Sequence, residues 1–442
     1  MADLNSIDTI VVVIMENRSF DHILGHLSLP GPSRLAVDGI QDSEEWRRRF
    51  ANPGPPNNFM YEATPLTALH VADPPHERSN IKIQLGDRGA DGVFPMKGFI
   101  QSAGGNSQVM QFYRADTIPI TDFFAHNFAV CDRWFAPLPA GTQANRLMAL
   151  SGQSEIDTNV NNPAEFPDQQ LAYDWLNQRN VRWRVYHQGF FPFFALMPRW
   201  LPHMVVGDEF RRFDRFKLDF ELETDATFPN VIFVEPKYTD SPHIGEGTDD
   251  HSPSSVLPGQ AFLLDIYNVL ISNPLRWRKT VMILTHDEHG GFFDHVQPLP
   301  IVTKDPRGRY PDFISTGVRV PAIVISPLVS PGRIHDHPLD HTSILKFLGQ
   351  KFGGGKYGPG VDDRLGVGSV LDVLDLNAPR QLIPPAPDAS VIPAAEPFVR
   401  GFKAQTENVK IFQDVTHRVT AVPEFRHALA TKFPEYRDFL GI

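Results

Sequence analysis

Five short runs in this 442-residue chain are apolar at nearly every position and rich in β-branched residues. Such runs are typical of strands covered on both faces, as in a parallel sheet, because a half-exposed strand would alternate apolar and polar residues. Segments with helical spacing, such as Asn145 to Ser151 and Gln260 to Ile271, lie between them. The alternation predicts an α/β fold whose mostly parallel central sheet is flanked by helices. The five predicted strands are Thr9–Met15, Val181–Tyr186, Asn230–Val234, Thr280–Leu284 and Val318–Ile325.

The length allows one large domain with insertions or a small second unit. We expect an α/β domain over residues 1–353, with residues 155–228 as an insertion or cap within it. Residues 354–442 are Pro-rich and Ala-rich before helical spacing returns at Glu424 to Leu440. This last part is expected to be a C-terminal extension without chemistry of its own.

Forty prolines and 32 glycines gather in long connections, notably Ser28 to Pro75 and Pro298 to Tyr310. These connections predict elaborate loops, which is where binding and catalytic residues commonly lie. The aromatic segment from Tyr186 to Trp200 holds two prolines, which disfavours an uninterrupted helix. It is interpreted as packing of the insertion on the domain, with an apolar wall for a lipid or an aromatic leaving group as the alternative.

The formal net charge is -11 and the isoelectric point is near 5.8. A field of this sign repels nucleic acid and anionic membranes, so no nucleic-acid partner is expected. Cys131 is the single cysteine, which excludes an intrachain disulfide and predicts a small buried side chain. No run approaches the roughly 20 apolar residues of a membrane span, and the N-terminus lacks a signal-peptide pattern. A soluble protein is expected, either cytoplasmic or exported with its signal absent from this sequence; the oligomeric state is not indicated.

Polar side chains follow four of the predicted strands. Because the carboxyl ends of parallel strands meet at one edge of a sheet, these side chains should lie near one another. A single acid in such a place is usually a helix cap, but four coincidences are harder to explain in that way. Carboxylates and an amide oxygen suit one divalent cation, such as calcium, magnesium or manganese, with zinc and iron as alternatives. The residues concerned are Glu16 and Asn17, His187, Glu235, and Asp287 and Glu288.

Thr142 follows Gly141 and directly precedes a helical pattern in the string LPAGTQANRLMALSG. Its hydroxyl should therefore lie near a helix N-terminus, which attracts anions. Such a hydroxyl is a weak nucleophile unless a metal and the helix end stabilise its alkoxide. The alternative is a plain threonine N-cap.

Several histidines lie in stretches of the sequence that are rich in polar residues. Most of these histidines are expected to be structural. Phosphoryl transfer nonetheless needs hydrogen-bond donors for the phosphate oxygens and an acid for the leaving group, and histidine supplies both. The string HDEH lacks the spacing of the zinc motif HExxH, so a zinc protease is not predicted. The histidines are His76, His251, His286, His289 and His295.

Three strings carry a resemblance to a known family: ENRSFDHILG from Glu16, PAGTQANR from Pro139 and HDEHGGFFDHV from His286. Together they resemble the phosphoesterase family of the alkaline-phosphatase-like superfamily, which contains non-specific phospholipases C and certain bacterial acid phosphatases. The resemblance runs in family order to about residue 350. Supporting strings are DPPH ending at His76, FPMKGFI before Gln101, DDHSP from Asp249, GVRVPAIVISPLV from Gly317 and LDHTSIL from Leu339.

The resemblance implies an alkaline-phosphatase-like sheet and a single metal ion. The positions that match the family's metal ligands are Glu16, Asn17, Asp287 and Glu288. Thr142 matches the nucleophile and would also contact the metal.

The resemblance also implies a phosphate pocket lined by His76, His187 and His251 together with Asn17. His76 or His251 would protonate the leaving oxygen. One departure is Gln143-Ala144, where the family often has a proline before Asn145.

The implied activity is metal-dependent hydrolysis of a phosphoester through a phosphothreonine intermediate. The leading substrate class is a phosphodiester cleaved as by phospholipase C, with a phospholipid as one candidate. The alternatives are a broad-specificity acid phosphatase and, more remotely, a non-catalytic phosphate-binding or metal-binding protein. The larger bacterial phospholipases C carry further C-terminal β-rich domains that this sequence is too short to hold.

Overall fold

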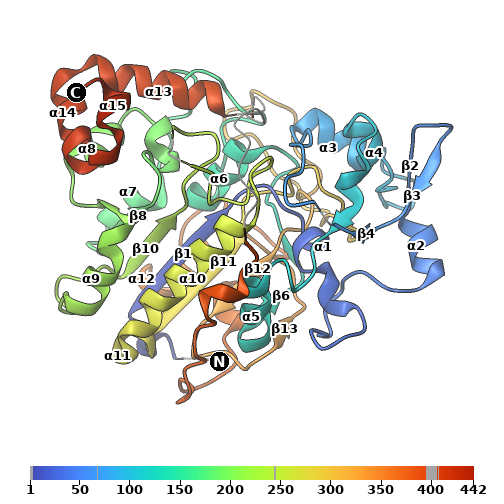
Figure 1. The fold of residues 1–442 in the computed structure, drawn as a ribbon, viewed down its shortest axis with the longest axis horizontal. Helices are drawn as coiled ribbons and strands as arrows, with labels where there is room; N and C mark the ends of the chain where they lie inside the picture. Colours follow the sequence, from blue (N-terminus) through green and yellow to red (C-terminus); the bar gives the residue numbers. More distant parts are fainter. Residues whose placement is uncertain (1–2, 67, 243–244, 395–405, 407) are drawn as a thin grey trace.

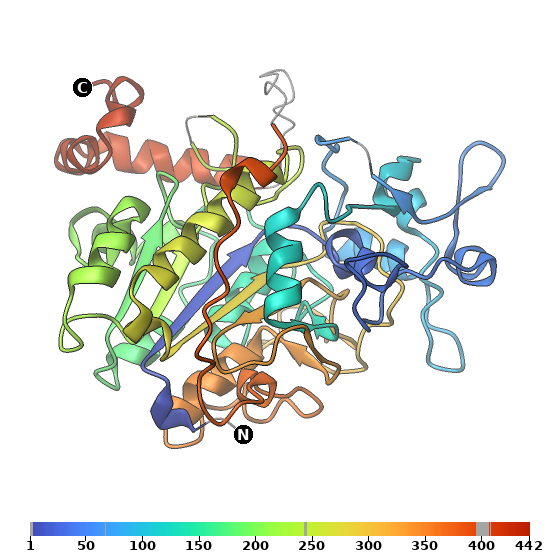
Figure 2. The same cartoon turned by 60° about the horizontal axis from the view of Figure 1, so that its bottom comes forward.

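A central sheet lies between layers of helices in the computed structural model, which describes residues 3–66, 68–242, 245–394, 406 and 408–442 (Figures 1 and 2). Its strand order within the described residues is β13-β6-β12-β11-β1-β10-β8-β9. The strands are β1 (Thr9–Met15), β6 (Ala129–Cys131), β8 (Trp183–His187), β9 (Phe210–Arg212), β10 (Val231–Glu235), β11 (Thr280–His286), β12 (Ala322–Ile325) and β13 (Arg333–His335).

The middle of the sheet is parallel, as predicted. β1 pairs in parallel with β10 on one side and β11 on the other, so Val13 lies between Val234 and Leu284. β12 alone runs antiparallel to its neighbours β11 and β6. The prediction of a strand over Val318–Ile325 is wrong in its first half, because Pro321 offers no backbone donor and the strand begins after it.

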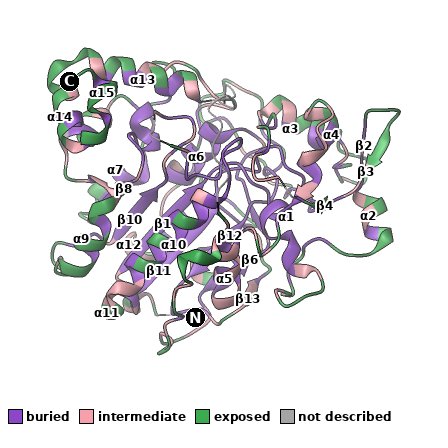
Figure 3. Cartoon of the chain, in the orientation of Figure 1, coloured by how far each residue is buried: buried purple, intermediate pink, exposed green. Residues whose placement is uncertain are grey.

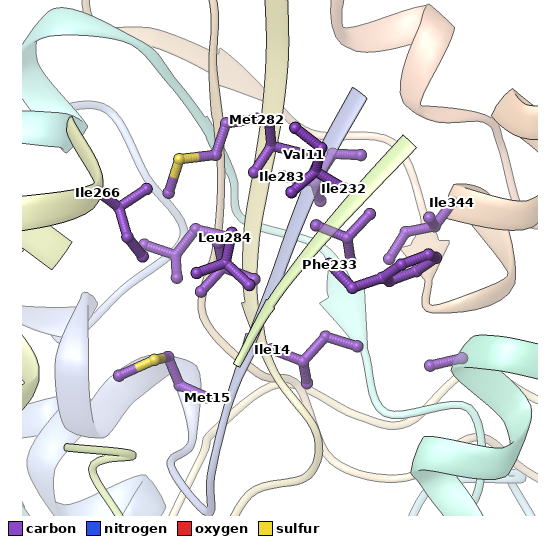
Figure 4. Close-up of a cluster of buried hydrophobic side chains, with 14 of the residues drawn as sticks. Val11, Ile14, Met15, Ile232, Phe233, Ile266, Met282, Ile283, Leu284 and Ile344 are labelled. Atoms are coloured by element: carbon purple, nitrogen blue, oxygen red, sulfur yellow. The ribbon is translucent and has the colours of Figure 1, made fainter. Parts of the chain in front are cut away.

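Helices cover both faces of this sheet. Figure 4 shows Met282 and Leu284 directed toward Ile266 of α10, whereas Phe233 points toward Ile344 of α12 on the opposite side. The helices are α1 (Phe20–Ile23), α2 (Glu44–Phe50), α3 (Arg78–Leu85), α4 (Phe99–Ser102), α5 (Pro119–Asn127), α6 (Thr142–Ser151), α7 (Ala172–Asn177), α8 (Leu201–Val206), α9 (Phe216–Leu222), α10 (Leu257–Ser272), α11 (Pro274–Trp277), α12 (Thr342–Phe352), α13 (Val409–Ala421), α14 (Pro423–Lys432) and α15 (Arg437–Leu440).

Both predicted helices exist and begin about one turn earlier than their apolar spacing indicated, α6 at Thr142 and α10 at Leu257. In the described parts of the chain, no helix combines the length and the apolar character that crossing a bilayer requires. Cys131 is fully buried in β6, as expected.

The long connections contain short elements that the sequence pattern did not predict. In the described part of the chain they form three two-stranded sheets outside the central one. These strands are β2 (Asn52–Gly54) with β3 (Phe59–Tyr61), β4 (Thr64–Pro65) with β5 (Gln111–Phe112), and β7 (Trp134–Phe135) with β14 (Leu339–Asp340).

The C-terminal helices α13 to α15 pack beside α8 and the aromatic segment (Figures 1 and 3). Lys432 Nζ donates to the carbonyl oxygens of Met204 and Phe210 at 2.8 and 2.6 Å. The ring of Phe190 stacks on Tyr436 with centroids 4.7 Å apart. The aromatic segment is buried, in agreement with the packing interpretation, and residues 155–228 contribute β8 and β9 to the sheet.

Candidate functional site

The loops that follow β1 and β11 are locked together at the carboxyl edge of the sheet. Asp287 N donates to the carbonyl oxygen of Met15 at 3.0 Å, and Asn17 N donates to Asp287 Oδ1 at 3.0 Å. Arg18 N donates to the carbonyl oxygen of Glu288 at 3.0 Å. The carboxylates of the two loops are therefore placed against each other by the backbone.

The backbones of Asn17 and Gly290 approach each other closely, and each position accepts few residue types. Asn17 has a φ of 57°, a left-handed conformation that asparagine tolerates better than most side chains do. A Cβ atom on Gly290 would lie 2.2 Å from the carbonyl oxygen of Asn17, so only glycine fits there.

Thr142 is the first residue of α6, and its fully buried hydroxyl faces these loops. Its Oγ1 lies 3.3 Å from Asn17 Oδ1 and 3.5 Å from Glu16 Oε2. The plain N-cap interpretation is wrong, because Gly141 occupies the cap position. The hydroxyl is thus free of a capping bond and lies where the helix N-terminus favours negative charge.

The amide of Asn17 indicates where a cation would bind. Its Oδ1 lies 3.0 Å from Glu16 Oε2 and 3.1 Å from Glu288 Oε1, so oxygens from three side chains converge, and the Thr142 hydroxyl is the donor beside Oδ1 at 3.3 Å. Turning the amide by 180° would instead place its NH₂ group between the carboxylates as a donor. The first orientation fits a cation among the oxygens, and the second places the positive end of the amide dipole there instead.

Two carboxylates at this edge, those of Glu16 and Asp287, share one guanidinium, that of Arg146. Glu16, Asp287 and Glu288 are at most 2% exposed. Arg146 Nη2 lies 2.6 Å from Glu16 Oε1, and its Nε lies 3.5 Å from Asp287 Oδ2. Burial raises the pKa of Glu16 well above its usual range, although Arg146 opposes the shift. Asp287 Oδ2 receives no hydrogen bond from the described residues, so this oxygen-rich set fits a divalent cation.

Arg146 lies within one of the quoted strings, yet it was not predicted as a site residue. It stands four positions after Thr142, on the same face of α6, and this spacing was the available signal. Its Nη1 donates to Tyr238 Oη at 3.0 Å, and its guanidinium lies 4.8 Å from the ring centroid of Phe193. The aromatic segment therefore supports the site from behind.

His76 approaches the same amide from a loop before α3. Its Nδ1 donates to the carbonyl oxygen of Pro74 at 2.6 Å, which leaves Nε2 directed at Asn17 at 2.9 Å. The same Nε2 lies 3.6 Å from Glu288 Oε1. The imidazole is fully buried.

His251 approaches the same atom of the Asn17 amide as His76 does, with its Nε2 2.7 Å away. Burial opposes protonation, but the neighbouring Asp73, Asp240 and Asp249 outweigh it and raise the pKa of His251. Its Nδ1 has no hydrogen-bond partner among the described residues. These acids therefore favour the protonated form of the imidazole.

His187 and Glu235 are not brought into this group. His187 Nδ1 donates to the carbonyl oxygen of Gly189 at 2.8 Å, its ring lies 5.5 Å from Phe433, and burial lowers its pKa to about 3. Glu235 accepts from Phe193 N at 2.5 Å. No hydrogen bond or ring contact of the described residues joins His187 to Thr142.

A second acidic cluster uses the later residues of the same two strings. Arg319 Nη2 lies 3.0 Å from Asp21 Oδ1, and its Nε lies 3.1 Å from Asp294 Oδ1. His295 Nδ1 lies 2.6 Å from Asp21 Oδ2, and its pKa is raised to about 9 because Asp21 and Asp38 outweigh the effect of burial. Arg133 Nη1 lies 3.7 Å from Asp38 Oδ2, so three acids face three cations, and we interpret the cluster as structural.

The remaining histidines of the strings also have structural partners. His289 Nε2 lies 2.8 Å from Gln84 Oε1, and burial lowers the pKa of His289 to about 3. His341, which was not predicted, accepts from Trp134 Nε1 at 3.0 Å. Its other nitrogen must therefore carry the proton that it donates to the carbonyl oxygen of Asp287 at 2.6 Å.

Comparison with known proteins places this arrangement in context. A sequence model of the Phosphoesterase family matches residues 7–353. Non-specific phospholipase C1 of Arabidopsis thaliana is 33% identical over 359 residues, which are 77% of this chain and 64% of the plant protein. Phospholipase C B of Mycobacterium tuberculosis is 30% identical over 397 residues, covering 79% of this chain and 74% of that protein. The chain thus spans just under two thirds of the length of the plant relative.

Among solved structures, the phosphonate monoester hydrolase of Agrobacterium radiobacter aligns with a TM-score of 0.38 at 11% identity. The alignment covers 85% of this chain and 78% of that protein. A similarity of this degree does not indicate a shared reaction.

Proposed function

From the premise that this chain belongs to the phosphoesterase family, we propose that it is a metal-dependent phosphoester hydrolase that cleaves phosphodiesters in the manner of a phospholipase C. The observation that carries the proposal is the Thr142 hydroxyl, which lies at a helix N-terminus and faces the buried carboxylates of Glu16 and Asp287, two acids that share the one guanidinium of Arg146. The names of the plant and mycobacterial relatives support the diester as the substrate class.

Glu16, Asn17, Asp287 and Glu288 would hold the divalent cation, with Thr142 beside it. When bound, the cation supplies positive charge that lowers the pKa of the hydroxyl and offsets the charge of the phosphate. Arg146 contributes a further fixed positive charge 2.6 Å from Glu16.

Thr142 is the nucleophile in this proposal. Its hydroxyl proton passes to Glu16 Oε2, 3.5 Å away, as Oγ1 forms a bond to phosphorus. The bond from phosphorus to the leaving oxygen breaks, and its electron pair stays with that oxygen. The product is a phosphothreonine that retains the head group of a diester.

His251 supplies the proton that the leaving oxygen takes up, because its neighbouring acids favour the charged imidazole. A water then attacks phosphorus and gives its proton to His251. As the bond to Thr142 breaks, the threonine oxygen regains its proton from Glu16. The histidine and the carboxylate both end the cycle as they began it.

A direct test compares three substrates under the same metal and pH conditions: phosphatidylcholine, p-nitrophenylphosphorylcholine and p-nitrophenyl phosphate. We expect kcat/KM for the diesters to exceed that for the monoester. A monoester that wins by tenfold or more would replace the diesterase with an acid phosphatase. No turnover of any of the three with added divalent metals would favour the non-catalytic binding protein.

A further inference from the structure

Arg18 is a fully buried arginine for which the described residues provide no carboxylate within ion-pair distance. Its Nε donates to the carbonyl oxygen of Asp250 at 2.9 Å, and its guanidinium lies 4.7 Å from the ring centroid of Phe292. A buried cation without an anionic partner is costly, so its retention needs another reason.

His22 completes the environment of Arg18 in a fixed protonation state. Its Nδ1 donates to the carbonyl oxygen of Gln111 at 2.7 Å, so Nε2 can accept from Arg18 Nη1 at 3.2 Å. Burial, reinforced by Arg18, lowers the pKa of His22 well below its usual range. The neutral ring and the carbonyl oxygen of Asp250 therefore hold Nη1 and Nε of the guanidinium, while Nη2 has no hydrogen-bond partner among the described residues.

Asp250, whose carbonyl oxygen Arg18 holds, has a strained backbone. Its φ is 71°, and its Oδ2 lies 3.1 Å from His286 Nε2. A non-glycine residue in this region persists only where its surroundings fix it. On one side, the carbonyl oxygen of Asp249 accepts from Glu16 N at 2.7 Å; on the other side stands His251.

The three residues each adjoin a residue of the proposed active site. Arg18 follows Asn17, Asp250 precedes His251, and His286 precedes Asp287. A bond between Arg18 and Asp250 therefore joins the loop of Asn17 to the loop of His251. The bond between Asp250 and His286 joins that second loop to the end of β11.

We propose that Arg18, Asp250 and His286 are positioning residues that hold the imidazole of His251 against the Asn17 amide, where it can protonate the leaving oxygen. This inference rests on the proposed function. None of the three contacts the reacting atoms, so their effect passes through the placement of His251.

The test uses two substrates that transfer the same phosphocholine group but differ in the oxygen that leaves. p-Nitrophenylphosphorylcholine releases an aryl oxyanion that needs no proton, whereas soluble dibutyroylphosphatidylcholine releases an alkoxide that does. Arg18→Lys should lower kcat for the alkyl substrate at least about tenfold more than for the aryl substrate, at the low end of what a general acid contributes. Equal losses for the two substrates would overturn the inference.

Asp250→Asn is the second variant, in case Arg18→Lys does not fold, because it keeps the side-chain volume and the backbone carbonyl. It should show the same discrimination between leaving groups. The matched control is Arg319→Lys, an equally buried arginine in the balanced cluster, which should slow both substrates by the same factor. Discrimination in the control as well would count against a specific role for Arg18.

His251→Gln separates this inference from the proposed function. It should show the largest discrimination of the set, about a hundredfold. If His251→Gln shows none, the assignment of the acid in the proposed function is wrong and the positioning role falls with it. If His251→Gln discriminates and both positioning variants do not, the positioning role alone is overturned.

Discussion

Two acidic clusters lie side by side in sequence but differ in how their charges are balanced. Both draw residues from the strings that begin at Glu16 and His286. In the structural cluster, Arg319, His295 and Arg133 balance Asp21, Asp294 and Asp38. In the candidate site, the carboxylates outnumber the cations.

The difference separates a structural cluster from a functional one. A buried ion costs several kcal/mol unless a partner compensates it, so a balanced cluster is complete without a ligand. An unbalanced one needs a cation from outside. Residue types alone could not distinguish the clusters, because both contain acids and histidines within polar stretches of the sequence.

Thr142→Ala should give the largest loss of activity among these variants. It should not change the charges of either acidic cluster. It removes the attacking oxygen, so kcat should fall at least about a thousandfold. Metal content by elemental analysis and the free energy of unfolding should stay close to those of the wild type. Activity within tenfold of the wild type would rule out a covalent role for Thr142.

Arg319→Met should break the structural cluster. It leaves Asp21 and Asp294 buried without their guanidinium, at a cost of about 3–5 kcal/mol in the free energy of unfolding. The check is a urea titration of the variant, with metal content measured on the folded fraction. An unchanged midpoint would show that the cluster does not need its arginine, and loss of metal would show that the two clusters are coupled.

Asp287→Asn should have the opposite signature. Turnover should fall about a hundredfold or more and metal occupancy should drop, because one negative charge leaves the proposed site. In the presence of a chelator, the variant should be no less stable than the wild type, since it removes an incompletely compensated buried charge. Asp294→Asn is the matched control and should retain metal.

The pH dependence of stability should reveal the structural cluster through His295. Its folded pKa of about 9 exceeds the usual value of 6.5. The stabilisation is therefore complete below pH 6.5 and is lost as the pH rises through 9, by at most about 3 kcal/mol. His295→Gln should unfold with a flatter pH dependence across this window. Equal slopes in urea titrations of the two proteins would contradict the assignment.

The strand-end rule predicted much of the candidate site because it depends only on local sequence. β1 and β11 are adjacent in the sheet, so Glu16, Asn17, Asp287 and Glu288 meet as that rule requires. His187 satisfies the same rule, yet β8 is separated from β1 by β10. Strand order is a tertiary property that apolar runs do not encode.

Two residues near the site, His341 and Arg146, were not predicted from the sequence. They are identified by their contacts in the folded protein. His341 reaches Asp287 from a distant part of the chain, and Arg146 is recognisable only by its spacing from Thr142. Strands such as β6 and β13 are three residues long, too short for periodicity to show. The C-terminal extension was expected to lack chemistry, but Asn408 Oδ1 accepts from Gln143 Nε2 at 2.8 Å, next to Thr142.

The central place of β1 has a consequence for biosynthesis. β1 leaves the ribosome before the other described strands of the central sheet, and its partners β10 and β11 follow about 215 and 265 residues later. At roughly 5–20 residues per second, this fully apolar segment waits on the order of ten seconds to a minute before it can pair. During that time it is a short β-prone sequence without charge, the type that aggregates most readily. Efficient production in cells should therefore depend on chaperones that shield the newly made β1 segment.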